Sequence, residues 1–221
     1  MSRIVVITID GPSGVGKGTL AQKLCQLTGF HLLDSGAIYR ALAFGVVKNN
    51  LQQDKVDAIV QLAQQLPVRF EQGKIYYEDE DISQAIRNEK IAGVASQIAA
   101  MPAVRQALLN RQKAFAQPPG LVADGRDMGT VVFPEAEVKL FLTATPEVRA
   151  KRRLDQLAQQ GERADFAKIV TEIEARDQRD QNRKTAPLKP AKDALIIDTS
   201  HLGIEEVLKT AYQAVKEKIS I

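Results

Sequence analysis

Uninterrupted apolar runs alternate along this chain with segments in which apolar residues recur every three or four positions. Most of the runs are rich in β-branched residues and lack polar alternation, which predicts strands buried on both faces, as in a parallel sheet covered by helices. Such strands are expected at residues 4–9, 31–33, 121–124, 138–142 and 194–198. Helices are expected at residues 17–28, 35–47, 54–66, 89–100, 102–116, 147–160 and 204–219. This alternation predicts an α/β fold.

The spacing of apolar residues changes from a helical to a strand pattern after Pro67. Short runs at residues 68–70, 74–77 and 81–82 are divided by Gln72-Gly73 and by an acidic segment, which predicts a small antiparallel meander. A meander inside an otherwise alternating α/β chain is interpreted as an insertion.

A glycine-rich stretch follows the first apolar run directly. It consists of Gly11, Pro12, Ser13, Gly14, Val15, Gly16, Lys17, Gly18 and Thr19. Between a strand and a helix, this pattern predicts a loop whose backbone N–H groups surround the phosphates of a nucleotide such as ATP. Lys17 would add a charge toward the outer phosphates, and Thr19 can reach a hydrated Mg²⁺. A glycine-rich turn without a ligand is the alternative.

Gly18 stands where such loops usually carry Ser or Thr, and the hydroxyl arrives one residue later. In this respect the loop is similar to those of the nucleoside monophosphate kinases.

Two later turns carry polar residues beside expected strands. In the first, Asp34 or Ser35 can serve simply as a helix N-cap, although Arg40 one turn later also suits a phosphate. In the second, Asp124 ends a strand and Arg126-Asp127 follow at once. Ligands bind at the carboxyl ends of strands in open α/β sheets, but an ordinary surface turn would show the same letters.

Charged residues dominate from residue 147 to residue 184. Helical spacing places one set on a single face, namely Arg176, Arg179, Asp180 and Arg183. Arg149 and Arg153 share a face of the preceding helix. The two stripes fit either a solvated hairpin with internal ion pairs or a mobile cap that closes over phosphates.

Composition narrows the class of protein. A net charge of +3 and a pI near 8.9 do not require nucleic acid and suit a small anionic substrate. The single cysteine, Cys25, excludes an intramolecular disulfide. Because neither a signal-peptide pattern nor a run of membrane-spanning length is present, a soluble cytoplasmic protein is expected. Nothing in the pattern calls for more than a monomer.

The motifs at residues 11–19, 34–40 and 125–130, together with the arginine-rich hairpin, resemble the bacterial cytidylate kinases over nearly the whole chain. That resemblance implies a P-loop kinase fold in three layers, with a five-stranded parallel sheet flanked by helices. The core would comprise residues 1–65, 117–146 and 186–221. Residues 66–116 would form the monophosphate-binding region with its antiparallel insert, and residues 147–185 a helical lid.

The resemblance also implies transfer of the γ-phosphoryl group of ATP to CMP or dCMP, with Mg²⁺. The phosphoryl group would be handled by Lys17, Arg126, Arg153 and Arg176. Cytosine would be surrounded by Ser35, Ser96, Arg105 and Asp127. The acceptor phosphate would be held by Arg40, Arg126 and Arg176, and its sugar by Asp180 and Arg183.

Three other functions fit parts of the sequence. A kinase of the same shape could act on UMP, dTMP or a non-nucleotide acceptor. A nucleotide-dependent switch would share the phosphate loop, although the arginine motifs beyond it favour a second anionic substrate. Nucleic-acid binding is the weakest alternative, because the arginines are interspersed with acidic residues and lack aromatic neighbours.

Overall fold

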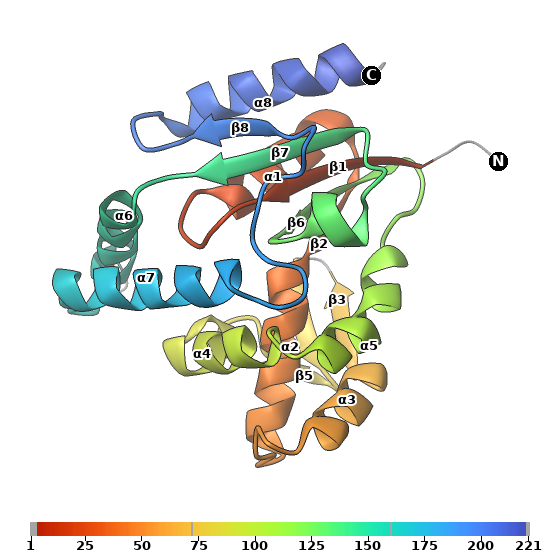
Figure 1. The fold of residues 1–221 in the computed structure, drawn as a ribbon, viewed down its shortest axis with the longest axis vertical. Coiled ribbons are helices and arrows are strands. Elements are labelled where there is room, and N and C mark those ends of the chain that lie inside the picture. Colours follow the sequence, from red (N-terminus) through yellow and green to blue (C-terminus); the bar gives the residue numbers. More distant parts are fainter. Residues whose placement is uncertain (1–3, 72, 160, 220–221) are drawn as a thin grey trace. The chain divides into compact units, whose positions relative to one another are not determined.

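The computed structural model describes residues 4–71, 73–159 and 161–219. The chain divides into two compact units, which are Met1–Leu33 with Phe115–Ile221, and Asp34–Ala114. Figure 1 follows the chain through both units.

The first unit is built on a five-stranded sheet in the order β2-β6-β1-β7-β8. Its strands are β1 (Val5–Asp10), β2 (His31–Asp34), β6 (Gly120–Gly125), β7 (Val138–Thr143) and β8 (Leu195–Asp198). β1 pairs in parallel with β6 and β7, and β7 pairs in parallel with β8. The expected α/β fold is therefore confirmed, and the central strand delivers the phosphate loop between its two neighbours.

Helices cover this sheet. α1 (Lys17–Thr28) contacts β6 and α8 (Ile204–Lys218) contacts β7, and the two helices also contact each other. Their apolar faces close over Ile7 and Ile9, which are completely buried in the main core. The core fixes both ends of the phosphate loop, since β1 precedes the loop and α1 follows it.

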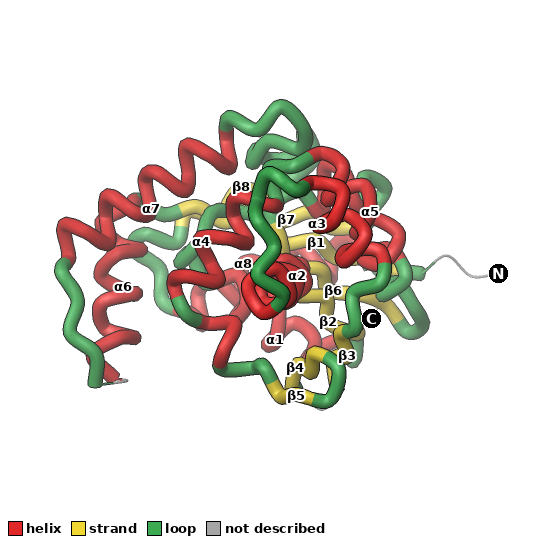
Figure 2. Tube along the Cα trace, turned by 90° about the horizontal axis from the view of Figure 1, so that it is seen from below, coloured by secondary structure: helices red, strands yellow, loops and turns green. Residues whose placement is uncertain are grey.

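A helical hairpin completes the first unit. α6 (Pro146–Gln159) and α7 (Phe166–Gln181) lie side by side in Figures 1 and 2, and they share a small apolar cluster around Ala150, Leu157 and Ile169. The position predicted to end the first of these helices, Gln160, lies outside the described residues.

Among its described residues the second unit contains four α-helices and the expected meander. The helices are α2 (Ser35–Lys48), α3 (Val56–Gln64), α4 (Glu89–Ile98) and α5 (Pro102–Lys113). α2 packs on α4, and α3 packs on α5. The antiparallel sheet consists of β3 (Val68–Glu71), β4 (Lys74–Tyr77) and β5 (Glu80–Asp81). Gln72, predicted to separate the first two of these strands, lies outside the described residues.

The compact unit that contains the meander extends from Asp34 to Ala114, because α2 packs on α4 and α3 packs on α5. Two features were missed by the sequence prediction. A short 3₁₀ helix, η1 (Ala85–Arg87), precedes α4. The segment after β6 forms a π-helical turn, η2 (Met128–Val132), where only a turn was expected.

Candidate active site

The phosphate loop depends on a close backbone approach at its first residue. Gly11 has φ +147°, and a Cβ at this position would lie 2.2 Å from the carbonyl oxygen of Leu142 in β7. Only glycine allows this contact, so the loop can leave β1 tightly against the neighbouring strand.

Side chains donate hydrogen bonds to the carbonyl oxygens of the loop at four consecutive positions. The donors are Lys17 Nζ to Pro12 at 2.8 Å, Arg149 Nη1 to Ser13 at 3.3 Å, Arg152 Nη1 to Gly14 at 3.4 Å and Thr199 Oγ1 to Val15 at 3.2 Å. These contacts engage carbonyl oxygens and not the N–H groups through which a loop of this kind binds an anion.

Lys17 is buried at the start of α1, with 7% of its surface exposed. Burial, followed by the positive charge of Arg126, lowers the pKa of Lys17 to about 7. The carboxylate of Asp124 lies 3.9 Å from Nζ and opposes this shift. Because burial and nearby arginines both disfavour the charged amine, the negative charge of a polyanionic ligand would stabilise it.

Asp10 ties the end of β1 to the segment after β6. Its two carboxylate oxygens accept hydrogen bonds from the backbone N–H groups of Met128 and Gly129, each at 2.8 Å. Burial raises the pKa of Asp10 to about 7, and the negative charge of Asp127 adds to the shift. The carboxylate thus positions the short segment that carries the expected ligands Arg126 and Asp127.

Replacing Asp10 with asparagine should change how stability depends on pH. The pKa of Asp10 rises from 3.8 to about 7 on folding, so the folded protein binds more protons than the unfolded chain between these values. The free energy of unfolding therefore falls as the pH rises through this window. Asp10→Asn removes the titrating carboxyl group and with it this pH dependence. The free energy of unfolding of wild type minus that of the variant should therefore fall by on the order of a few kcal/mol between about pH 4 and about pH 7.

Urea denaturation at several pH values measures this difference. Asp155→Asn, which removes an exposed carboxylate on α6, is the matched control and should give a constant difference from wild type. A constant difference for Asp10→Asn as well would show that Asp10 keeps its ordinary pKa.

An ion-pair network surrounds Asp180. Its carboxylate accepts from Arg126 Nε at 3.0 Å and from Arg183 Nη2. Burial acts to raise the pKa of Asp180, but the arginines outweigh it and the pKa lies below its ordinary value. The structure thus brings together three of the expected acceptor-binding residues, and it keeps Asp180 charged.

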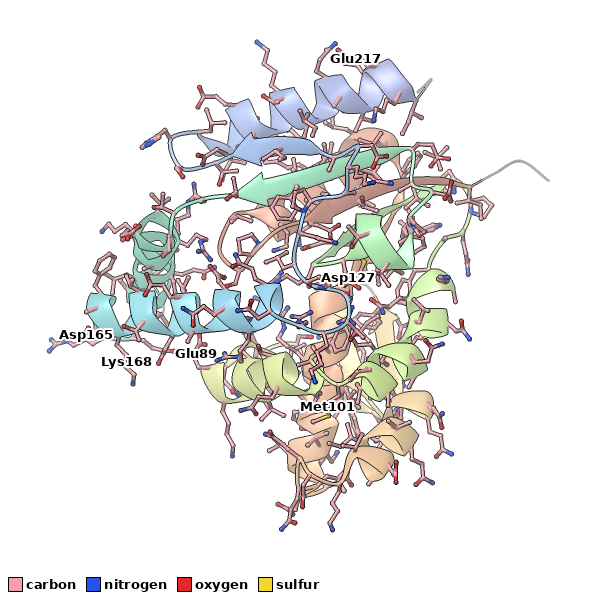
Figure 3. All side chains as sticks on the ribbon, in the orientation of Figure 1. Glu89, Met101, Asp127, Asp165, Lys168 and Glu217 are labelled. Carbon is pink, nitrogen blue, oxygen red and sulfur yellow. The ribbon has the colours of Figure 1, made fainter. Side chains whose placement is uncertain are left out.

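Three other expected residues of the first unit lie on separate elements. Arg176 on α7 is close enough for its charge to lower the pKa of Lys17. Asp127, labelled in Figure 3, follows β6 and is 3% exposed. Arg153 lies farther along α6, where its Nη1 donates to Gln156 at 3.3 Å.

The predicted arginine stripes are only partly present. Arg179 is exposed, whereas its neighbour Asp180 is buried, and Arg183 lies beyond the end of α7. Arg149 does not lie on a solvated face with Arg153 but is the largest fully buried side chain, 2% exposed. Spacing along a helix could not reveal this, because the phosphate loop that covers Arg149 is distant in sequence.

In the second unit, Asp34 is the N-cap of α2. Its carboxylate accepts from the Ala37 N–H at 2.8 Å and lies 3.5 Å from Arg40 Nη2. The neighbouring Ser35 is buried, and its hydroxyl donates to Gln112 on α5 at 2.7 Å. The capping interpretation is thus confirmed for Asp34, and Gln112 is a buried polar partner that the sequence did not indicate.

Ser96 and Arg105 lie on α4 and α5. The Ser96 hydroxyl is buried and has no hydrogen-bond partner among the residues that the structure describes. Arg105 donates to the Ala99 carbonyl at 3.1 Å, and its guanidinium lies 5.7 Å from the ring centroid of Tyr39 on α2. A buried hydroxyl without a partner is costly, so a ligand that bonds to Ser96 would recover that cost.

The residues beside the phosphate loop fit Mg²⁺. Thr19 is exposed in the first turn of α1, and Asp124 lies close to the same turn, with one carboxylate oxygen 3.6 Å from the Cβ position of Gly18. A hydroxyl and a carboxylate are oxygen donors of the kind that Mg²⁺ uses together with water and substrate phosphates. No cluster of three or more His, Cys, Asp or Glu residues suited to a metal occurs among the described residues.

Comparison with known proteins places these features in a family. The family model described as cytidylate kinase matches residues 7–217. The cytidylate kinase of Aeromonas hydrophila is 54% identical over 97% of this chain and 95% of its own length. That of Klebsiella pneumoniae is 49% identical over 100% of this chain and 99% of its own length.

A solved structure, TT1252 from Thermus thermophilus, covers 100% of both chains at 19% identity with a TM-score of 0.49, a likeness too low to support any inference. The assignment rests instead on the family match and on relatives that are about half identical over nearly the full length. The expected resemblance is confirmed: this chain belongs to the cytidylate kinase family.

Proposed function

We propose that this protein transfers the γ-phosphoryl group of ATP to CMP or dCMP, giving ADP and CDP or dCDP. Membership of the cytidylate kinase family supports the reaction. The structural observation that carries it is the buried Lys17, whose pKa is depressed beside Arg126 and Arg176. Positive side chains beside a phosphate loop suit a reaction in which negative charge spreads over a transferring phosphoryl group.

ATP would bind with its phosphates at the N–H groups of residues 11–19, and Lys17 would move its Nζ from the Pro12 carbonyl to the outer phosphates. Thr19 and Asp124 would hold Mg²⁺, through water at Thr19. When bound, this ion supplies charge neutralisation at the β- and γ-phosphates. The three carbonyl contacts made by Arg149, Arg152 and Thr199 preorganise the loop, since they do not depend on Lys17.

Asp127 and Arg105 suit the cytosine base. Cytosine offers the N4 amino group as a donor and N3 and O2 as acceptors, so a carboxylate such as Asp127 can accept from N4. Arg105 can donate to N3 and O2. Ser35 and Ser96 would complete the base-binding set, and the Ser96 hydroxyl, which lacks a partner among the described residues, supports that role.

Arginines would bind the acceptor phosphate, namely Arg40, Arg126 and Arg176. Arg126 Nε donates to Asp180, so a phosphate would share a guanidinium that is already oriented. Asp180 and Arg183 would contact the sugar hydroxyl groups. Arg153 would approach the transferring group from α6.

The reaction needs no general base. An oxygen of the acceptor monophosphate attacks the γ-phosphorus, the bond from that phosphorus to the β–γ bridging oxygen breaks, and ADP leaves with the electron pair. Alignment and positive charge carry such transfers, and Lys17 with the arginines supplies that charge here.

The proposal also assigns a role to two segments of the chain. Residues 66–116 would act as the monophosphate-binding region and residues 147–185 as a lid. Only small-molecule substrates are proposed, without nucleic acid or a membrane surface, for a monomeric cytoplasmic enzyme. No helix in the described part of the chain is both long and apolar enough to cross a bilayer.

A panel of acceptors tests the proposed reaction. Formation of ADP from ATP is measured with CMP, dCMP, UMP, dTMP and AMP in turn. CMP and dCMP should give kcat/KM values at least about 10-fold above the others, because a mismatched base leaves buried polar groups unpaired at about 1–3 kcal/mol each. A preference for another monophosphate would redirect the acceptor assignment, and ATP binding without any transfer would favour a nucleotide-binding switch.

A further inference from the structure

The guanidinium of Arg149 joins three segments that are far apart in sequence. Nε donates to the carbonyl oxygens of Ala144 at 3.0 Å and Thr145 at 3.3 Å, where β7 leads into α6. Nη1 donates to the carbonyl oxygen of Ser13 in the phosphate loop at 3.3 Å. Nη1 and Nη2 together form a two-pronged ion pair with Asp177 on α7, at 3.1 and 2.5 Å. All three guanidinium nitrogens therefore donate to protein acceptors.

This contact is unusually well buried for an ion pair. The Arg149 side chain is 2% exposed and the Asp177 side chain 14%. The arginine stem also lies against the loop itself, because a Cβ on Gly14 would come within 3.1 Å of Arg149 Cβ. A shift of the phosphate loop at Ser13 and Gly14 therefore acts directly on Arg149.

Asp177 lies within one helical turn of expected substrate ligands. It follows Arg176 directly and precedes Asp180 by three positions on α7. An apolar cluster that includes Leu157 and Ile169 also joins α6 to α7, toward the end of α7 where Figure 3 labels Asp165 and Lys168. The Arg149–Asp177 ion pair joins the two helices nearer the C-terminal end of α7.

We propose that Arg149 and Asp177 are positioning residues that couple occupancy of the phosphate loop to the placement of the acceptor-binding residues on α7. Nη1 and Nη2 of Arg149 both bond to Asp177 on α7, and Nη1 also donates to Ser13 in the loop. A nucleotide that holds the loop in place would therefore hold α7 in place as well. The inference rests on the proposed function only in giving α7 an acceptor to bind. The mechanical link itself requires nothing beyond a nucleotide at the phosphate loop.

Hydrogen exchange measures this link without any acceptor. A non-hydrolysable ATP analogue should slow amide exchange in wild type both at residues 11–19 and in α7, by about 5-fold or more. In Asp177→Asn, protection of residues 11–19 should persist, while the effect on α7 should fall below about twofold. Arg149→Lys, which keeps the charge but not the fork, should behave in the same way and serves if Asp177→Asn fails to fold.

Lys151→Ala provides the matched control. It breaks the exposed Lys151–Asp155 pair at 2.9 Å on the same helix and should leave protection of α7 as in wild type. Binding measurements add a second readout. In wild type the ATP analogue should lower the Kd for CMP, CMP should lower the Kd for the analogue by the same factor, and Asp177→Asn should bring that factor close to 1. A merely structural role would change the separate affinities and leave this factor as in wild type.

Protection of α7 that survives in Asp177→Asn or Arg149→Lys would overturn the proposal, as would its absence from wild type. Failure of the proposed function can be told apart from failure of this inference. In the first case the acceptor panel with wild-type protein would show no transfer to CMP. The exchange experiment is independent of that outcome, because it uses the ATP analogue alone.

Discussion

Lys17→Ala should reduce kcat by about a thousandfold, which corresponds to roughly 4 kcal/mol of lost transition-state stabilisation. Lys17 Nζ donates to the Pro12 carbonyl at 2.8 Å and lies 3.9 Å from Asp124, so it is already positioned at the loop. The free energy of unfolding should change far less, by about 1–2 kcal/mol. The variant loses one hydrogen bond, but it also avoids the unfavourable burial of an amine. Turnover and urea denaturation measured on the same preparation separate the two effects.

Lys139→Ala is a matched control for this experiment. Lys139 is similarly buried, and its Nζ donates to the Pro134 carbonyl at 2.6 Å and to Asp193 at 3.0 Å. That variant should lose stability and keep turnover per folded molecule. Near-normal turnover in folded Lys17→Ala would contradict the role assigned to this lysine.

The depressed pKa of Lys17 gives an independent readout. Because the pKa is about 7 without ligand, the amine is largely neutral above that pH. The negative charge of a bound ATP analogue raises the pKa, so binding should take up protons at about pH 8. Calorimetry in buffers of different ionisation enthalpy measures this uptake, which Lys17→Ala should abolish.

The strands, the helices and the phosphate loop were predictable because each depends on neighbouring residues. A buried parallel strand shows itself as an apolar run, and the loop follows β1 directly. Gly29 ends α1 with φ +72°, as its position after the last apolar residue indicated. At these points local sequence and tertiary structure impose the same requirement.

Asp10 shows where local reasoning stops. It is the last residue of β1, and nothing beside it in sequence indicates a partner. Its hydrogen bonds go to Met128 and Gly129, which are 118 and 119 positions away. The parallel pairing of β1 with β6 brings them together, with Asp10 opposite Gly125. Such a contact follows from strand order, which the apolar pattern does not determine.

The burial of Arg149 was missed for a related reason, because the segments that cover it are distant in sequence. Helical spacing correctly put Arg149 and Arg153 one turn apart, but it could not say that the phosphate loop covers one of them and not the other. The exposed fraction of 2% at Arg149 results from packing against Gly14 and Asp177. The sequence therefore indicated which residue types serve the site but did not separate those that bind substrate from those that hold the site in place.

Replacing Asp127 should change which base the enzyme accepts. A carboxylate accepts from the cytosine N4 amino group and repels the O4 of uracil, whereas the amide of Asp127→Asn can donate to O4. The ratio of kcat/KM for CMP to that for UMP should therefore fall by about 10- to 100-fold, equivalent to about 1–3 kcal/mol. KM for ATP should change by less than about twofold, because the phosphate loop retains its contacts. Initial rates with both acceptors at varied concentration give all three quantities.

Asp127→Ala distinguishes recognition from simple loss of a contact. Alanine offers neither donor nor acceptor, so activity with CMP should fall without the gain with UMP that asparagine brings. Asp155→Asn, on the exposed face of α6, should leave the ratio unchanged.

If both Asp127 variants kept the wild-type preference, the base would have to be selected by hydrogen-bond donors alone, and the residue to test next would be Arg105. A guanidinium can meet O2 of either pyrimidine, so that outcome would also predict weak discrimination between CMP and UMP in the wild-type enzyme.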